Sequence, residues 1–381
     1  MKTSKDRILT THVGSLTRSQ AVTDVVFARE HGKQLDEAAA SATIRDAVSD
    51  VVQLQAVAGV DIVSDGEMSK ISYATYIKDR ITGFEGDSPR QAPKDLEEFP
   101  GFLQRQASSG GTPTYSRPCC VADIRVKDMG PVTEDIENFR AAMAGADVVE
   151  GFMNAASPGV IALFQPNHHY PDHESYLEAL AEAMRPEYEA ITEAGLILQL
   201  DSPDLGLGRH MMFKDKTEQE YRQLAGLHVE ALNHATRNID PGKMRLHVCW
   251  GNYEGPHHCD APMSTVLPIA LKARPQALLF ETSNPRHAHE WTVFRDTEIP
   301  DDKILVPGVL DSTTNFVEHP ELVAERICRF ADIVGRERVM AGSDCGFSTF
   351  AGFGAVDQDI VYAKLASMAE GARIASKTLW S

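Results

Sequence analysis

The residues best suited to chemistry in this sequence are a histidine, two cysteines and a glutamate that end three short apolar segments. The motif Leu-His-Val-Cys ends one segment at Cys249, Glu281 ends another in Phe-Glu-Thr-Ser, and Cys345 ends a third in Gly-Ser-Asp-Cys. If 244–249 is a strand, its two-residue pleat places His247 and Cys249 on one face, where they can chelate. One imidazole, two thiolates and one carboxylate suit tetrahedral Zn²⁺. The sequence therefore predicts a zinc site formed by these four residues.

This ligand set favours chemistry on sulfur. Two thiolates leave the metal soft enough to accept another sulfur, and the carboxylate of Glu281 is the easiest ligand to displace. An incoming thiol would then be held as a thiolate at neutral pH. The alternative is that His247 and the cysteines are packed core residues, since free cysteine is among the most buried residue types. Their joint occurrence at three segment ends favours the metal.

Other histidine and cysteine clusters are weaker candidates. His257-His-Cys-Asp260 follows a glycine-rich loop, and neighbours in sequence cannot all face one ion, so we expect its histidines to contact substrate or solvent. His168, His169 and His173 fit loop or helix-cap positions.

Two acids at segment ends are unusual for a core. Glu67 in Asp-Gly-Glu and Asp201 in Leu-Asp-Ser-Pro would be rare as buried residues without partners. We expect them to bind a cationic group, such as the ammonium of an amino acid, or to handle protons. A structural alternative for Asp201 is the N-cap of a following helix.

These ends must be positioned by a larger fold, and the sequence offers eight strand candidates separated by helical patterns. Two of the helical patterns close at Gly59 and Gly335, where a glycine after a helix end belongs. The apolar runs are nearly continuous, as in parallel strands buried on both faces. The runs are 11–15, 61–67, 148–157, 196–201, 244–249, 277–281, 304–311 and 338–345.

Eight βα units predict a single (β/α)8 barrel over residues 1–381, whose reactive groups gather at the carboxyl ends of the strands. The gap between the second and third runs holds 82–118, rich in Gly, Pro, Ser and Glu, which we expect to be an inserted loop or lid. The alternative, an open doubly wound sheet, lacks its usual glycine-rich signature after the first run.

The composition and charge of the chain limit the classes of partner that we expect it to bind. A formal charge of −18 without a basic stripe argues against nucleic acid and membrane surfaces. No run approaches the length of a membrane span and no apolar signal follows the amino terminus, so we expect a cytoplasmic protein. The sequence does not determine the oligomeric state, and a homo-oligomer is one of the possibilities.

Taken in order, the motifs Thr11-His-Val-Gly-Ser-Leu, Asp-Gly-Glu67, Leu-Asp201-Ser-Pro, His-Val-Cys249, Phe-Glu-Thr-Ser and Ser-Asp-Cys345-Gly resemble the catalytic barrel of cobalamin-independent methionine synthase. The resemblance covers almost the whole chain. It implies that the four ligands above bind zinc and that homocysteine contacts fall on the residues Gly14, Ser15, Glu67 and Asp201.

Two departures concern the methyl donor. The classical enzyme is a double barrel, whereas this chain corresponds to the catalytic half. Where the family has a histidine proposed to donate a proton, this chain has Thr313, two residues after Asp311. A methyl group on a folate nitrogen leaves well only when that nitrogen is protonated, so a methyl-corrinoid, a sulfonium or an epoxide also fits as donor.

The leading hypothesis is therefore a zinc-dependent thiol S-methyltransferase that acts on homocysteine or a similar small thiol. The epoxyalkane:coenzyme M transferases resemble the same barrel, and an enzyme of that kind would anchor an anionic thiol by a cation such as Arg18. A zinc-dependent hydrolase or lyase would use the metal to activate water, although two thiolate ligands weaken its acidity toward water. A non-enzymatic metal-binding barrel is the last alternative.

Overall fold

Seven parallel strands form one curled sheet. The computed structural model describes residues 1–89, 92–108 and 116–381, and within them the strand order is β1-β4-β5-β6-β7-β8-β9. All neighbouring pairs are parallel, as the βα alternation predicted. The strands are β1 (Ile62–Ser64), β4 (Glu150–Ala156), β5 (Ile197–Asp201), β6 (Met244–His247), β7 (Ala277–Phe280), β8 (Ile304–Leu310) and β9 (Gly342–Ser343).

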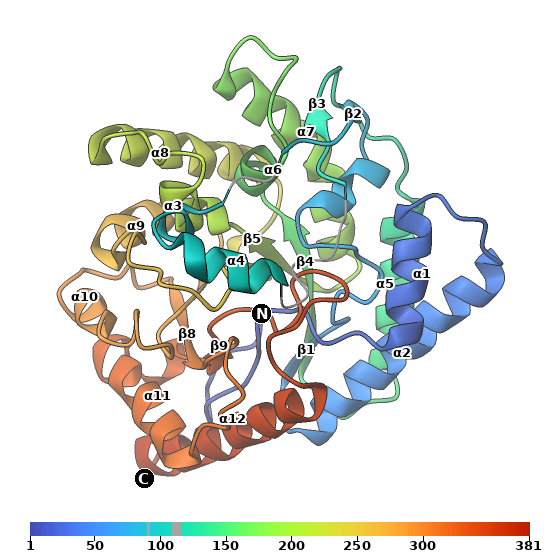
Figure 1. Ribbon diagram of the computed structural model, residues 1–381. Helices are drawn as coiled ribbons and strands as arrows, with labels where there is room; N and C mark the ends of the chain where they lie inside the picture. Colours follow the sequence, from blue (N-terminus) through green and yellow to red (C-terminus); the bar gives the residue numbers. More distant parts are fainter. Residues whose placement is uncertain (90–91, 109–115) are drawn as a thin grey trace.

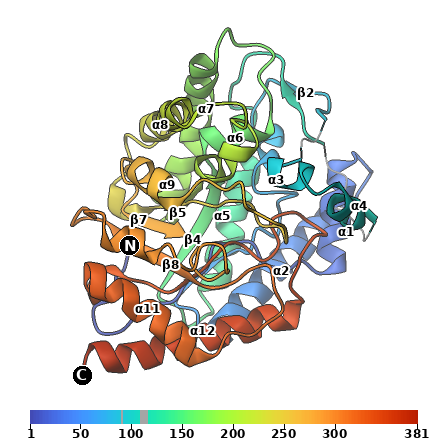
Figure 2. The same cartoon turned by 60° about the vertical axis from the view of Figure 1, so that its left-hand side comes forward.

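Helices surround the outer face of this sheet (Figures 1 and 2). None of those in the described ranges is long and apolar enough to cross a bilayer. The α-helices outside the segment 82–118 are α1 (Gln20–Glu30), α2 (Glu37–Val57), α5 (Gly130–Met143), α6 (Pro158–Phe164), α7 (His173–Glu193), α8 (Glu218–Ala235), α9 (Met263–Ala270), α10 (Trp291–Arg295), α11 (Pro320–Val334) and α12 (Gln358–Leu379). Short 3-10 turns are η1 (Thr75–Asp79), η2 (Pro203–Leu205), η3 (Leu207–His210), η4 (Pro241–Lys243) and η5 (Arg336–Arg338).

The predicted helix ends are confirmed. Helix α2 begins at the N-cap Asp36, whose side chain accepts from two backbone N–H groups, and Gly59 follows its end with a φ of +83°. Helix α11 begins with Pro320 and ends at Gly335, whose φ is +87°. Glycine adopts this left-handed conformation without the steric cost that a side chain brings.

The chain near Thr10 joins the two edges of the sheet. Thr10 forms an isolated parallel bridge with Ala341 beside β9, and its carbonyl accepts from the N–H of Ile62 in β1 at 3.0 Å. The predicted strand over 11–15 is wrong, because the chain leaves the extended conformation at Gly14, where φ is +136°. It turns there across the carboxyl ends of the other strands.

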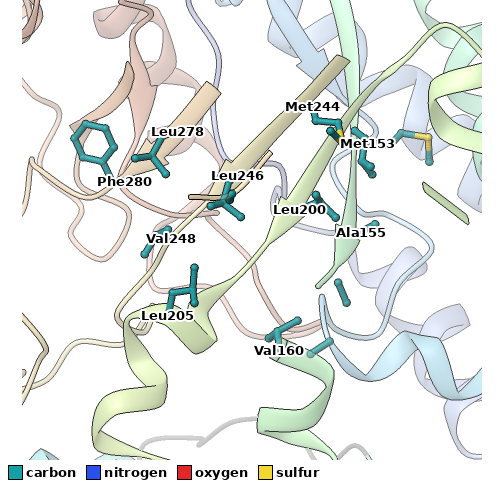
Figure 3. Close-up of a cluster of buried hydrophobic side chains, with 14 of the residues drawn as sticks. Met153, Ala155, Val160, Leu200, Leu205, Met244, Leu246, Val248, Leu278 and Phe280 are labelled. Carbon is teal, nitrogen blue, oxygen red and sulfur yellow. The ribbon is translucent and has the colours of Figure 1, made fainter. Parts of the chain in front are cut away.

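Side chains of the strands alternate between two cores. Figure 3 shows Met244, Leu246 and Val248 among the residues that pack between sheet and helices. The intervening residues of the same segment, Arg245 and His247, therefore face the interior of the barrel. The interior cluster consists of Leu9, Val13, Ile62, Phe152, Ile197, Ala277, Leu279, Ile304, Val306 and Met340.

The segment 82–118 has structure of its own. A two-stranded antiparallel sheet of β2 (Phe84–Glu85) and β3 (Cys119–Cys120) forms its base. Between them, α3 (Lys94–Glu97) and α4 (Pro100–Ser108) lie in front of the strands in Figure 1. Within the segment, the Ser-Ser-Gly-Gly-Thr stretch 108–112 lies outside the described residues except for Ser108. That this segment is an insertion that moves as a lid stays a prediction.

The contact between Gly308 in β8 and Asp344 after β9 can be tested by stability. A Cβ at position 308 would lie 2.0 Å from Asp344 Oδ1 and 2.6 Å from its Cα. We expect Gly308→Ala to lower the free energy of unfolding by about 1–3 kcal/mol, because the backbone must shift. The measurement is urea unfolding followed by circular dichroism.

The matched control is Gly226→Ala in α8, where a Cβ meets nothing within 4 Å. This substitution should raise the free energy of unfolding by roughly 0.5–1 kcal/mol, since alanine favours a helix interior. Equal unfolding midpoints for the two variants would contradict the tight contact at Gly308.

Candidate metal centre

His247, Cys249 and Cys345 gather at the carboxyl ends of β6 and β9. Each offers a ligand atom, and these atoms all lie within 4.8 Å of one another. The two Sγ atoms are 3.5 Å apart, and all three side chains are buried. The structure thus brings three of the four predicted ligands into one cluster.

Asp201 at the end of β5 orients the imidazole of His247. His247 Nδ1 lies 3.1 Å from Asp201 Oδ1, so the ring donates there and Nε2 is the nitrogen left for a metal. Among the described residues Nε2 has no hydrogen-bond partner although it is buried. Asp201 also accepts from Gln199 Nε2 at 2.8 Å and from Asn154 Nδ2 at 2.9 Å. It is not the N-cap considered as its alternative role.

Glu281 lies beside the cluster but outside the 4.8 Å group. Its Oε1 accepts from the backbone N–H of Trp250 at 2.9 Å, and its Oε2 accepts from Asn284 Nδ2 at 2.7 Å. Burial, followed by the nearby Cys249, raises the pKa of its carboxyl well above the usual range. These two hydrogen bonds hold Glu281 outside the group of His247, Cys249 and Cys345, so its role as the fourth ligand stays a prediction.

The electrostatics of the cluster fit a dication. The hydrogen bond with Cys345, followed by burial, raises the pKa of the Cys249 thiol well above its ordinary value. The Gly251 N–H donates to Cys249 Sγ at 3.2 Å. Two adjacent thiols, an unpartnered imidazole nitrogen and a buried carboxylate are the ligand set of a soft divalent metal, whose charge would offset their burial.

Glu67 is held in a strained turn after β1. Its φ is +58°, an uncommon conformation for a residue with a side chain, and its buried Oε2 has no partner among the described residues. Burial raises the pKa of Glu67 to about 7, and Lys70 acts against that shift. Strain of this kind gathers at functional sites, where surrounding contacts over-determine the backbone.

Arg18 supplies one of those contacts and does not face the thiols. Its NH2 donates to the backbone carbonyl of Glu67 at 2.6 Å, and its NH1 donates to the carbonyl of Ser348 at 2.8 Å. Lys70 Nζ likewise donates to the Asn154 carbonyl at 2.6 Å. Both cations thus brace backbone at the mouth.

Gly14 and Ser15 stand in the turn after Val13, and only Ser15 lines the cavity described below, so a homocysteine contact at these two residues stays a prediction. A Cβ at Gly14 would lie 2.1 Å from Asn154 Oδ1, so this glycine gives the Asn154 side chain room to reach Asp201. The Ser15 carbonyl accepts from the Phe347 N–H at 2.9 Å, which ties the turn to the loop after Cys345.

Asp311 and Thr313 form a local turn after β8. The Thr313 hydroxyl and its N–H both donate to Asp311 Oδ1, at 2.9 and 3.0 Å, and the Thr314 hydroxyl donates to Oδ2 at 2.6 Å. Asp311 therefore orders the turn that presents Thr313 to the mouth.

A cavity of about 1270 Å³ opens at this end of the barrel. Its lining includes the predicted residues Ser15, Glu67, Asp201, His247, Cys249, Thr313 and Cys345. Gly14, Arg18, Glu281 and Asp311 lie outside the lining. Leu96 of α3 and Leu103 of α4 form part of the wall, so the segment 82–118 covers the mouth.

Asp95 fixes that cover. Its Oδ2 accepts from the Tyr253 hydroxyl and from the backbone N–H of His257, both at 2.8 Å, and the side chain is fully buried. His257 also interacts with Asp260, which pairs with Arg286. The cluster 257–260 is thus a loop, as expected, but only His258 is exposed to solvent, whereas His257 is buried and helps to hold the cover. Glu98, His258 and Cys259 form a second, more exposed group of ligand atoms.

Sequence reasoning missed Asn154, Gln199 and Arg245. Gln199 Oε1 accepts from Arg245 Nε at 2.7 Å, and the Arg245 guanidinium lies 3.5 Å from the ring centre of Phe152. A signal was present: Gln199 and Arg245 each stand two residues before a predicted site residue. The strand pleat puts them on the same inward face.

Comparison with known proteins agrees with this architecture. A methionine synthase of Saccharolobus solfataricus is 26% identical over 376 residues, covering 97% of this chain and 95% of that protein. One from Sulfurisphaera tokodaii is 24% identical over 372 residues, covering 97% and 93%. The structure of a B12-independent methionine synthase from a Shewanella species, in complex with selenomethionine, superimposes with a TM-score of 0.73 at 19% identity, covering 98% of this chain and 99% of that one. At this level of identity, the similarity to the Shewanella structure shows that the two chains share a fold.

A parallel α/β barrel with a His/Cys cluster at the carboxyl ends of its strands is the architecture of a barrel metalloenzyme. The family described as cobalamin-independent synthase, catalytic domain, matches residues 8–373, and the chain belongs to it. It is a methyltransferase of the methionine synthase type.

The orienting role of Asp201 predicts an effect on metal affinity. Asp201→Asn keeps the size of the side chain but weakens its hold on His247 Nδ1. We expect metal affinity to fall about 10–100-fold, the usual effect of losing such a carboxylate partner. The measurement is competition with a chromogenic chelator. Asp204→Asn is the matched control, because Asp204 Oδ2 lies 2.8 Å from Nδ1 of another buried histidine, His228, which does not belong to the cluster. An equal loss of metal affinity in both variants would contradict the role of Asp201.

The contacts of Asp95 predict that its removal detaches α3 from the loop that contains Tyr253 and His257. Asp95→Ala leaves the N–H of His257 and the hydroxyl of Tyr253 without their acceptor, at a cost of about 1–3 kcal/mol. We expect faster proteolysis within 82–118 and a higher KM. Glu97→Ala removes only the exposed ion pair with Lys214 and should leave both quantities nearly unchanged. Unaltered proteolysis of Asp95→Ala would show that other contacts hold the cover.

Proposed function

We propose that this chain is a single catalytic domain that transfers a methyl group to the sulfur of homocysteine with the help of Zn²⁺. The observation that carries the proposal is the imidazole of His247: it clusters with the thiols of Cys249 and Cys345, and its buried Nε2 has no partner among the described residues. The methionine synthases that resemble it over almost its whole length support homocysteine as the acceptor.

His247, Cys249 and Cys345 would hold the metal, with Glu281 as the fourth ligand when no substrate is bound. Zinc bound there supplies a Lewis acid that lowers the pKa of the substrate thiol, so that the sulfur is a nucleophile at neutral pH. The Trp250 N–H and the Asn284 amide, which hold the Glu281 carboxylate in this structure, would keep it away from the metal once the substrate thiol is bound.

The acids at the mouth place the substrate. Glu67 has a carboxylate oxygen without a hydrogen-bond partner among the described residues, and it lines the cavity together with Asp201. Both attract the ammonium group of an amino acid, while Ser15 lies on the same lining to contact its polar end. The walls from α3 and α4 exclude water, which limits loss of the methyl group to hydrolysis.

The alternatives are less consistent with the geometry. An alkyltransferase that anchors an anionic thiol through Arg18 needs that guanidinium in the cavity, but it holds the carbonyls of Glu67 and Ser348. A hydrolase or lyase needs a strongly acidic metal-bound water, which two thiolate ligands oppose.

Cobalt substitution tests this function without any methyl donor. We expect one Co²⁺ per chain, with a sulfur-to-cobalt absorption band that changes when homocysteine is added, and release of about one proton because the thiol binds as thiolate. Cys249→Ser and Cys345→Ser should lose most of the band. Cys328→Ser, on the outer helix α11, is the matched control and should keep it. A cobalt absorption spectrum that does not change when homocysteine is added would refute the proposal.

A further inference from the structure

One wall of the cavity is a cluster of aromatic rings. The rings of Tyr73 and Phe164 meet edge to face with centroids 5.7 Å apart, and those of Tyr73 and Phe350 are also 5.7 Å apart. All three residues line the cavity that reaches the metal ligands, as does Phe353. We call Tyr73, Phe164 and Phe350 the aromatic wall.

Backbone pairing fixes the aromatic wall in place. Ser72 forms an antiparallel bridge with Phe350, the Tyr73 N–H donates to the Thr349 carbonyl at 3.4 Å, and the Ala351 N–H donates to the Ile71 carbonyl at 2.9 Å. The loop after Cys345 and the loop after β1 therefore present their rings together. A binding surface held this way loses little entropy when a ligand arrives.

The charge of the cavity favours a cation. Its charged lining residues, within the described part of the chain, are the acids Glu67, Asp201 and Glu254. Aromatic faces attract cations through the ring quadrupole. Acids and rings together suit a small organic cation.

Two hydroxyl groups of the lining already have acceptors within the protein. The Thr313 hydroxyl donates a hydrogen bond to Asp311, and the Tyr253 hydroxyl donates one to Asp95. A methyl donor that leaves as an amine anion would need a proton in the transition state. A donor that leaves as a neutral molecule needs none, which matches this arrangement.

We propose that the cavity takes a methylsulfonium as its methyl donor and that the aromatic wall binds its cationic centre. The inference rests on the proposed function for the acceptor thiol. The acceptor loses its proton to solvent and attacks the methyl carbon as a thiolate, which forms a new carbon–sulfur bond. The bond from that carbon to the sulfonium sulfur breaks, and its electron pair stays on the departing neutral thioether.

The first experiment follows methyl transfer from trimethylsulfonium to homocysteine by zinc-loaded protein. We expect methionine and dimethyl sulfide in equal amounts. Transfer from 5-methyltetrahydrofolate or methylcobalamin, with none from trimethylsulfonium, would overturn the inference. The cobalt response to homocysteine separates the two proposals: if it is present, only the donor is wrong, and if it is absent, both proposals fail.

The second experiment tests the aromatic wall itself. Tyr73→Leu should raise the KM for trimethylsulfonium about tenfold while kcat and the cobalt response to homocysteine change little, and Tyr73→Phe should restore the KM because it keeps the ring. Tetramethylammonium, which does not react readily, should inhibit competitively, whereas the uncharged tert-butanol should not. Phe350→Leu serves if Tyr73→Leu does not fold. Equal inhibition by both compounds, or an unchanged KM in both leucine variants, would overturn the role of the wall.

Discussion

The hydrogen bond between His247 and Asp201 is the contact on which the rest of the site depends. The two residues are register partners on β6 and β5, and the residues two positions earlier, Arg245 and Gln199, are partners as well. Gln199 accepts from Arg245 and donates to Asp201, so a polar ladder runs from the guanidinium to the imidazole. Burial lowers the pKa of Arg245 to about 9. Because this value is still above neutral pH, the guanidinium stays charged. Its positive charge lies below a mouth rich in acids, and satisfied hydrogen bonds offset its burial.

Three glycines make this polar interior sterically feasible. A Cβ at Gly14 would collide with Asn154, one at Gly308 with Asp344, and one at Gly346 with the Ser15 hydroxyl. In each case the missing side chain gives space to a polar group that positions the mouth. Asp344, for example, accepts from the backbone N–H groups of 282, 283 and 284, and so ties the turn after Glu281 to the strand end that carries Cys345. Close packing thus sets the distance between ligands that are 64 residues apart in sequence.

Much of this site could be predicted because strand geometry is local. The pleat alone places His247 and Cys249 on one face, and the barrel rule puts Cys345 beside them. Glu281 was predicted as the fourth ligand but lies outside the 4.8 Å group, because the Trp250 N–H and the Asn284 amide hold its carboxylate, and no sequence pattern indicates those two partners. The first strand was predicted wrongly because Thr10 pairs only through an isolated bridge. Arg18 was assigned to substrate, yet it binds backbone carbonyls at sequence separations of 49 and 330 residues, which no local pattern reveals.

The strands and the loops carry different parts of the proposed chemistry. The groups that would activate the acceptor sulfur stand on β5, β6 and the end of β9, where sheet register and the polar ladder hold them rigidly. The aromatic wall and the cover of α3 and α4 come from loops, which tolerate change far better than strands do. A barrel of this kind can therefore keep its thiol chemistry while its loops select a different methyl donor. Thr313 fits that view, because it belongs to a turn ordered by Asp311 and not to the ladder. In the proposed reaction the strands would therefore hold the groups that act on the acceptor thiol, and the loops would supply the residues that select the donor.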